Sequence, residues 1–192
     1  MRLIKQKGGH LKDMKHKVLA ALFASILAAT PLFSSHLPVQ QSDEERLTAK
    51  IRKELVTLPF YGVFDDLRFS LQGRKVILAG EVTRPTLQSS AENVVKRIAG
   101  VEEVENHIEV LPLSPFDDRL RMKLYRTVFG QGSLGRYTLG AIPPVHIIVK
   151  NGNVTLVGNV MNEMDKNLAY MFANQVSGVF SVTNNLVVDK RS

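Results

Sequence analysis

The stretch Val76-Ile-Leu-Ala-Gly-Glu-Val82 decides the fold, because it recurs 78 residues later as Val154-Thr-Leu-Val-Gly-Asn-Val160. The same offset, without a gap, aligns further identical residues, which are Ala91, Gly100, Val101, Val104, Asn106 and Val110 in the first copy. Self-similarity at a fixed period is the signature of a duplicated structural unit. The chain therefore contains two copies of one fold.

Upstream of this stretch the offset between the copies falls to 73. Leu47, Ile51 and Leu55 then align with Leu120, Leu124 and Val128. The second copy thus carries an insertion of five residues between its first helix and its first strand. These alignments predict one domain over residues 43–112 and a second over residues 113–190.

Each copy is predicted to fold as helix, strand, strand, helix and strand. Ser42 and Glu45 form a capping box before a helical run, and Ser114-Pro115 begins its partner. Asn151-Gly152 lies between two apolar runs, as in a tight β-hairpin. A second helix begins near Pro85, and its counterpart begins near residue 162. The fold class is α+β, with two tandem αββαβ units, each a small three-stranded mixed sheet packed on two helices.

The repeated pattern resembles the BON domain, named after bacterial OsmY and nodulation proteins. The resemblance rests on V-x-L-x-G-x-V followed by Gly-Val-x-x-Val-x-Asn, which occurs from Val76 to Asn106 and again from Val154 to Asn184. It implies a tandem-BON protein of the periplasm, similar to OsmY-like proteins of envelope and osmotic stress. It also implies binding to phospholipid or other envelope components, and no enzymatic activity.

The residues shared by the two copies have structural explanations. Gly80 and Gly158 lie inside strands, where glycine marks a bulge or a close backbone approach. Asn106 and Asn184 are expected to bond to nearby backbone. These residues therefore predict a scaffold rather than a ligand site.

Residues 1–36 are predicted to be a signal peptide and leader. Lys15-His-Lys17 precedes the apolar run from Val18 to Ala29, which is the arrangement of a secretory signal. Met14 is an alternative start. We expect export to the periplasm, and the alternative is an uncleaved anchor in the inner membrane. The chain has no cysteine, which excludes disulfides and a lipidated N-terminal cysteine.

No catalytic or metal-binding constellation is found, so we expect a non-enzymatic protein without cofactors. His107 and His146 stand alone on predicted strands, and no histidine pair has metal-ligand spacing. Asp117-Asp118 lies in the first turn of a helix, where acids stabilise the helix dipole. The Gly130–Gly135 segment matches G-x-G-x-x-G but follows a helix, so we interpret it as a flexible connector in the insertion.

Charge is distributed unevenly along the chain. The leader holds most of the formal charge of +7. Residues 43–112 contain 10 basic and 12 acidic residues, whereas residues 113–192 contain 9 and 5. An excess of only +2 outside the leader, with few aromatic residues, excludes the electrostatic footprint of a nucleic-acid-binding protein.

The first helix of the second copy carries more apolar surface than the fold requires. Besides the stripe of Leu120, Leu124 and Val128, it has a second apolar stripe and a basic face at helical spacing. The predicted membrane-contact residues are Arg119, Met122, Lys123, Tyr125, Arg126 and Phe129. The alternative is that the second stripe packs under the insertion or against the first unit.

Two functional classes remain open. The first is a periplasmic module that binds anionic phospholipid surfaces and supports envelope integrity, because apolar burial and charge attraction add at a membrane. The second is an adaptor or chaperone-like module that binds envelope proteins through a sheet edge or the groove between the units.

Overall fold

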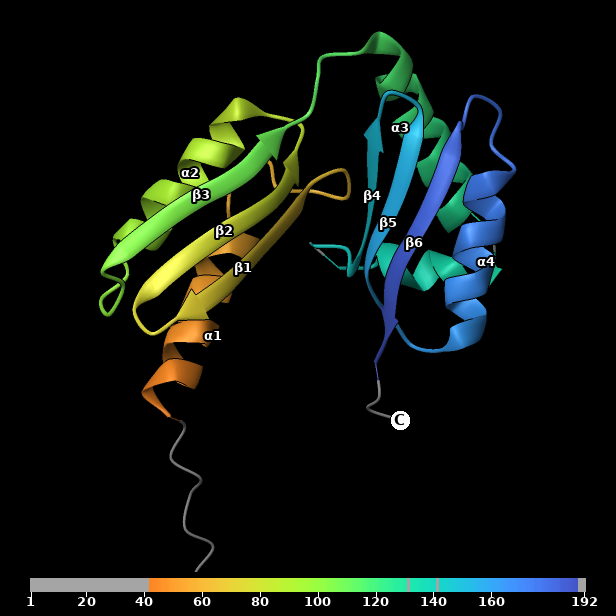
Figure 1. Cartoon of the computed structure of the whole chain (residues 1–192). Coiled ribbons are helices and arrows are strands. Elements are labelled where there is room, and N and C mark those ends of the chain that lie inside the picture. Colours follow the sequence, from red (N-terminus) through yellow and green to blue (C-terminus); the bar gives the residue numbers. More distant parts are fainter. Residues whose placement is uncertain (1–41, 131, 141, 190–192) are drawn as a thin grey trace, which may run out of the picture. The chain divides into compact units, whose positions relative to one another are not determined.

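The first half of the described chain folds as helix, hairpin, helix and strand (Figure 1). The structure is a computed structural model and describes residues 42–130, 132–140 and 142–189. The expected leader lies outside these residues. Within them, no helix is both long and apolar enough to cross a membrane. The first domain consists of α1 (Asp43–Val56), β1 (Asp66–Gln72), β2 (Lys75–Val82), α2 (Pro85–Lys96) and β3 (Glu103–Val110).

The second half repeats this order and adds one element. The second domain consists of α3 (Pro115–Phe129), a 3-10 helix η1 (Gly132–Thr138), β4 (Val145–Lys150), β5 (Asn153–Val160), α4 (Glu163–Asn174) and β6 (Ser181–Val188). The α+β class and the two αββαβ units are therefore as the sequence predicts.

Both sheets have the same topology and the same register. The strand orders are β1-β2-β3 and β4-β5-β6, with an antiparallel hairpin followed by a parallel strand. Val76 pairs with Val104 in the first sheet, and Val154 pairs with Val182 in the second. The offset of 78 residues thus holds at the level of individual strand pairs.

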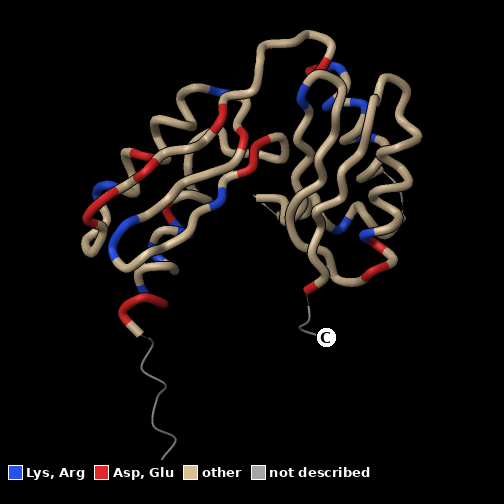
Figure 2. Tube along the Cα trace, in the orientation of Figure 1, with Lys and Arg blue, Asp and Glu red and all other residues tan. Residues whose placement is uncertain are grey.

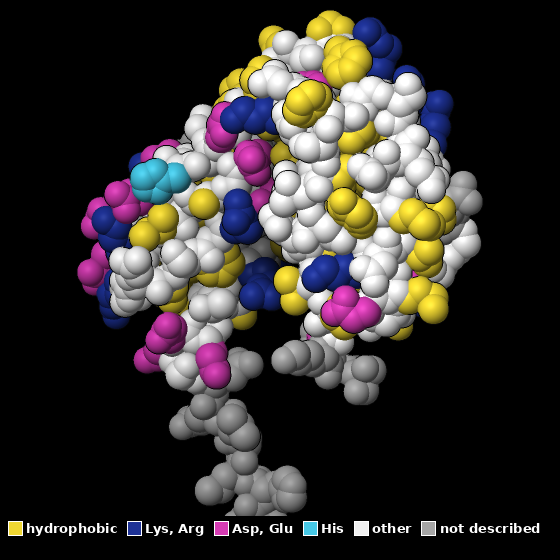
Figure 3. All heavy atoms as spheres, turned by 45° about the vertical axis from the view of Figure 1, so that its right-hand side comes forward, with side chains coloured by type: hydrophobic (Ala, Val, Ile, Leu, Met, Phe, Trp, Pro, Cys, Tyr) yellow, Lys and Arg dark blue, Asp and Glu magenta, His cyan; other side chains and the backbone are white. Residues whose placement is uncertain are grey.

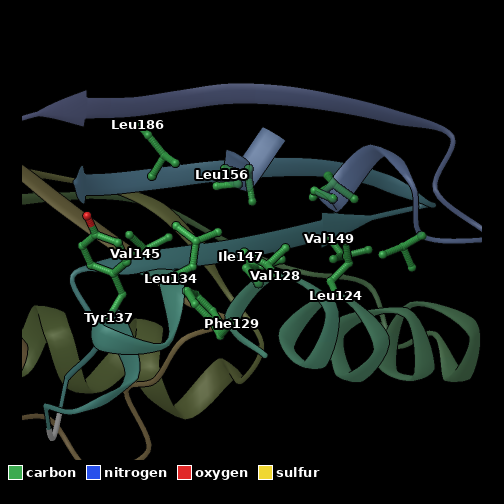
Figure 4. Close-up of a cluster of buried hydrophobic side chains, with 14 of the residues drawn as sticks. Leu124, Val128, Phe129, Leu134, Tyr137, Val145, Ile147, Val149, Leu156 and Leu186 are labelled. Carbon is green, nitrogen blue, oxygen red and sulfur yellow. The ribbon is translucent and has the colours of Figure 1, made fainter. Parts of the chain in front are cut away.

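Two helices cover one face of each sheet and enclose a core (Figure 1). Strand β2 alternates between buried and half-buried positions, as expected when one face of a sheet packs against helices. In the second domain, Leu124 and Val128 of α3 point toward β4, with Phe129 and Leu134 beside them (Figure 4). Because the cores draw on residues from Leu47 onward, a protein that begins at Ser42 retains both of them.

Within the insertion, Gly132–Thr138 forms a 3-10 helix, so the prediction of a flexible connector is wrong for these residues. Its 3-10 helix buries Leu134 and Tyr137 in the second core. The Tyr137 hydroxyl donates a 2.6 Å hydrogen bond to Asp165, at the beginning of α4, and accepts a 2.8 Å bond from the Met161 backbone N–H. The insertion therefore attaches to the second domain as part of its core.

The shared glycines and asparagines have the structural roles expected of them. A Cβ on Gly80 would lie 2.1 Å from the Asp66 carbonyl oxygen, and one on Gly158 would lie 2.0 Å from that of Pro144. Asn106 donates from its side-chain amide to the Gln88 carbonyl. Asn184 donates in the same way to the carbonyl of Lys166, the equivalent residue of α4. Each asparagine thus ties the last strand to the second helix.

The loop before β1 contacts the edge of β4. The Ile147 backbone N–H donates a 2.8 Å hydrogen bond to the Val63 carbonyl. The His146 Nδ1 lies 3.0 Å from the Gly62 carbonyl oxygen, and the imidazole stacks on the Tyr61 ring. The Ile147 bond occupies a backbone N–H that the edge strand β4 would otherwise expose.

Candidate functional site

Helix α3 carries the predicted membrane-contact residues, and its sequence explains its position. The Ser114 side chain accepts a hydrogen bond from the Asp117 N–H, and Pro115 occupies the first turn. Leu120, Leu124 and Val128 are fully or almost fully buried in the second core. The predicted core stripe therefore faces the sheet, and the opposite side of the helix faces solvent.

The basic face of α3 is exposed to solvent. Arg119, Lys123 and Arg126 are exposed. None of the three forms an ion pair with any residue that the structure describes. Met122 lies on the same helix with 45% of its surface exposed. Four of the six predicted residues thus lie together on an accessible surface, which we call the α3 face.

The other two predicted residues do not belong to the α3 face. Phe129 is only 6% exposed and lies in the second core. Tyr125 is half-buried and makes edge contacts with Phe129 and with Phe64 of the loop before β1. The structure therefore gives Tyr125 and Phe129 the packing role, because distant segments cover this flank of the helix.

A fourth basic residue of α3 points inward. Arg121 donates from Nη2 to the Val149 carbonyl at 2.7 Å and forms an ion pair with Asp118. Asp117 is completely buried and accepts hydrogen bonds from the backbone N–H groups of Asn151 and Gly152, each at 2.9 Å. The helix dipole therefore explains only part of its role, because this carboxylate also fixes the β4–β5 turn.

Sequence reasoning missed an exposed aromatic pair beside the α3 face. Phe116 is half exposed and lies against Gly178, where an added Cβ would meet its ring at 3.3 Å. Phe180 is 85% exposed, and both aromatic side chains border Gly152. The repeat alignment held a signal for this pair, because it places Phe116 and Phe180 opposite the acidic residues Asp43 and Glu102.

The equivalent place in the first domain is a pocket whose lining includes several charged residues. It has a volume of about 410 Å³ and is lined by Asp43, Leu47 and Gly100 among others. In the second domain Phe116 takes the position of Asp43 and packs over the corresponding glycine. The two domains share a fold but present different chemistry at this end.

The two domains differ in the number of acidic residues along their sequences. Asp and Glu occur along the strands and helices of the first domain and are fewer on the second (Figure 2). In the space-filling view, hydrophobic side chains and Lys or Arg side chains lie next to each other on the second domain (Figure 3). This combination suits an anionic and partly apolar partner.

Two titratable side chains, the buried His146 and the half-buried Tyr61, lie together near the β4 edge. His146 is 8% exposed, and burial lowers its pKa, while the Gly62 carbonyl and the carboxylates of Asp65 and Asp66 oppose this shift. The Tyr61 hydroxyl, whose pKa is raised by burial, lies 3.4 Å from His146 Nε2. Among residues 42–130, 132–140 and 142–189, no group of three His, Asp or Glu side chains could hold a metal ion.

Comparison with known proteins gives one family and several similar chains. The family model described as "BON domain" matches residues 43–112 and 131–190. The outer membrane lipoprotein DolP of Haemophilus influenzae is 26% identical over 178 residues, which cover 86% of this chain and 84% of that protein.

Two solved structures also match. Both are of CdsD, a structural protein of the type III secretion system of Chlamydia trachomatis. The C-terminal domain of CdsD is 14% identical, covers 79% of this chain and all of that one, and has a TM-score of 0.28. The other CdsD structure is 13% identical, covers 76% of this chain and 94% of that one, and has a TM-score of 0.29.

The family match covers the whole first αββαβ unit and the second unit from residue 131 onward, so α3 lies outside the matched range. Both matched ranges include the strand glycines and the asparagines that tie strand to helix. The chain therefore belongs to the BON domain family, with two BON domains in tandem.

Proposed function

We propose that this protein works in the bacterial envelope, where the α3 face of its second domain binds the surface of anionic phospholipid membranes. The observation that carries the proposal is the exposure of Arg119, Lys123 and Arg126, without ion-pair partners among the described residues, beside an exposed Met122. Each base near an anionic membrane surface contributes about 1 kcal/mol, and apolar contact adds to this attraction.

The similarity to DolP supports the envelope as the location. That relative is named an outer membrane lipoprotein, and the match covers most of both chains. The sequence of the present chain contains no cysteine that could carry a lipid. We propose that the protein reaches the envelope by export through the expected signal peptide and contacts the membrane through the α3 face. Envelope maintenance under osmotic stress, without catalysis, is the role that we propose.

The test compares charge reversals on equivalent helices. Lys123→Glu with Arg126→Glu alters the α3 face, and Lys50→Glu with Lys53→Glu alters exposed bases of α1. Proteins that begin at Ser42 are sedimented with phosphatidylcholine vesicles, with and without phosphatidylglycerol, at low and moderate salt. We expect the α3 variant to bind the anionic vesicles about tenfold more weakly or worse, and the α1 variant to bind like the parent protein.

Salt gives a second criterion. Binding to anionic vesicles should weaken as salt rises, because the attraction of exposed charges is screened. Equal binding by the two charge-reversal variants would contradict the assignment to α3. No binding of the parent protein to anionic vesicles at low salt would contradict the proposal as a whole.

A second candidate function is an adaptor for envelope proteins. It is favoured by β6, which is an edge strand of the second sheet and exposes 59% of Val187. An extended peptide could add to this edge through backbone hydrogen bonds. Such pairing is largely insensitive to salt, which distinguishes it from headgroup attraction.

A further inference from the structure

Helix α4 exposes apolar side chains that its fold does not require. Met164 is 70% exposed and Met171 is 43% exposed. The equivalent positions of α2 are Thr86 and Asn93, and both helices bury the equivalent alanines, Ala91 and Ala169. Two copies of one fold thus differ in the chemistry of an exposed helix face.

The arc of α4 that holds the two methionines carries no charge. At 100° per residue, Met164, Asn167, Met171 and Gln175 lie on one outward arc. The only basic residue of α4, Lys166, lies on the flank toward β6, where its carbonyl accepts from the Asn184 side chain. Of the acidic residues of α4, Asp165 is buried. Glu163 is exposed in the first turn and lies just outside the arc, beyond its Asn167 edge.

The same arc borders helix α3. Leu168 and Phe172 of α4 are half-buried and pack against the cluster that contains Leu120 and Leu124 of α3. The two helices are in contact along the same layer. An uncharged band that contains two methionines therefore runs beside the helix that carries the three open bases, and Figure 3 shows hydrophobic side chains over this part of the second domain.

We infer that α4 supplies the apolar contact of the membrane-binding surface, with Met164 and Met171 entering the boundary between headgroups and acyl chains of an anionic bilayer. The inference rests on the proposed function of α3. Charge complementarity favours a membrane as the partner of this face. The adjoining bases attract phosphate headgroups, and the uncharged band can leave water without the desolvation cost of a charged side chain. Methionine side chains are flexible and polarisable, so they adapt to an irregular apolar environment.

The absence of tryptophan from the chain permits a direct measurement. We would introduce one tryptophan at a time, as Met164→Trp, Met171→Trp and, as the matched control in the first domain, Asn93→Trp. All three sites are exposed helix positions. The proteins begin at Ser42, and their fluorescence is recorded with phosphatidylcholine–phosphatidylglycerol vesicles, with and without bromine on the acyl chains.

The expected result is a blue shift and quenching by brominated lipid for tryptophan at positions 164 and 171, and neither effect at position 93. Sedimentation of the same samples measures binding independently of the fluorescence. Bound protein with unquenched tryptophan at positions 164 and 171 would overturn the inference and leave the proposed function intact. Failure of all variants and of the parent to bind the anionic vesicles would overturn both.

A second pair of variants separates insertion from any effect of tryptophan. Met164→Thr with Met171→Asn gives α4 the residues of α2, and Thr86→Met with Asn93→Met makes the reverse change in the first domain. We expect Met164→Thr with Met171→Asn to keep the thermal midpoint of the parent protein. At moderate salt, its affinity for the anionic vesicles should be lower by about tenfold or more. If Met164→Thr with Met171→Asn bound the vesicles at moderate salt as strongly as the parent, a role for α4 would be contradicted. The same holds if Thr86→Met with Asn93→Met strengthened binding by as much as the α4 variant weakens it.

Discussion

The hydroxyl of Tyr137 donates a 2.6 Å hydrogen bond to the buried carboxylate of Asp165. Ser133 donates a second bond to the same carboxylate, and Arg136 forms an ion pair with it. A buried carboxylate is stable only when such donors satisfy it. This single residue of α4 therefore holds the 3-10 helix against the second domain.

Removal of the Tyr137 hydroxyl should destabilise the second domain. In Tyr137→Phe, Asp165 loses a donor and the Met161 N–H loses its acceptor. We expect the free energy of unfolding to fall by about 1–3 kcal/mol, measured by urea denaturation. Tyr170→Phe, on the exposed side of α4, is the control and should change stability by less than about 0.5 kcal/mol. Equal effects of the two changes would contradict this account of the insertion.

Gly158 should not tolerate a side chain. Its φ is 117°, and an added Cβ would lie 2.0 Å from the Pro144 carbonyl oxygen. We expect Gly158→Ala to lower the unfolding free energy by more than about 2 kcal/mol. Gly73 has a positive φ of 62° but nothing within 4 Å of an added Cβ, so Gly73→Ala should cost only about 1 kcal/mol. Chemical denaturation of both variants measures the difference, and a reversed order would refute the close approach.

Asp117 should contribute to stability through the hairpin turn. Asn in its place has one oxygen for two backbone N–H groups, those of Asn151 and Gly152, so one buried donor loses its acceptor. We expect Asp117→Asn to reduce the unfolding free energy by about 1–3 kcal/mol. Asp118→Asn keeps a side-chain oxygen that can accept from Nη1 of the buried Arg121, so it should cost less than Asp117→Asn. The thermal midpoints of the two variants test this order.

Stability should fall below neutral pH because of His146. Burial lowers the pKa of this imidazole from the ordinary value of 6.5, so the unfolded chain binds a proton before the folded protein does. The unfolding free energy should therefore be unaffected by His146 above about pH 7. Below pH 6.5 it should decline, by no more than about 1.4 kcal/mol per pH unit, until the pH reaches the lowered pKa.

Two variants isolate this contribution. His146→Gln should remove the part of the pH dependence between pH 5 and 7 that the imidazole causes. His107→Gln, at an exposed position of β3, should leave the profile as it is. Urea midpoints at pH 5, 6 and 7 provide the measurement, and a steep decline that persists in His146→Gln would assign it to another group.

The sequence by itself determined the repeated αββαβ order, the residue-by-residue equivalence of the two copies and the core stripe of α3. These features depend on local periodicity and on the duplication. Val76 and Val154, for example, occupy equivalent positions in their strand pairs, because the two copies place the same apolar residues in the same core positions. The roles of Gly80 and Asn106 followed from local backbone geometry in the same way.

Only the tertiary structure decided which side chains of α3 remain exposed. Phe64 and the 3-10 helix cover Tyr125 and Phe129, and Asp165 fixes that 3-10 helix from more than 25 residues away. The periodicity of one helix cannot show which neighbours will cover its flanks. The exposure of Met164 and Met171 was undecided for the same reason, since an apolar residue on a helix is buried or exposed according to what packs above it.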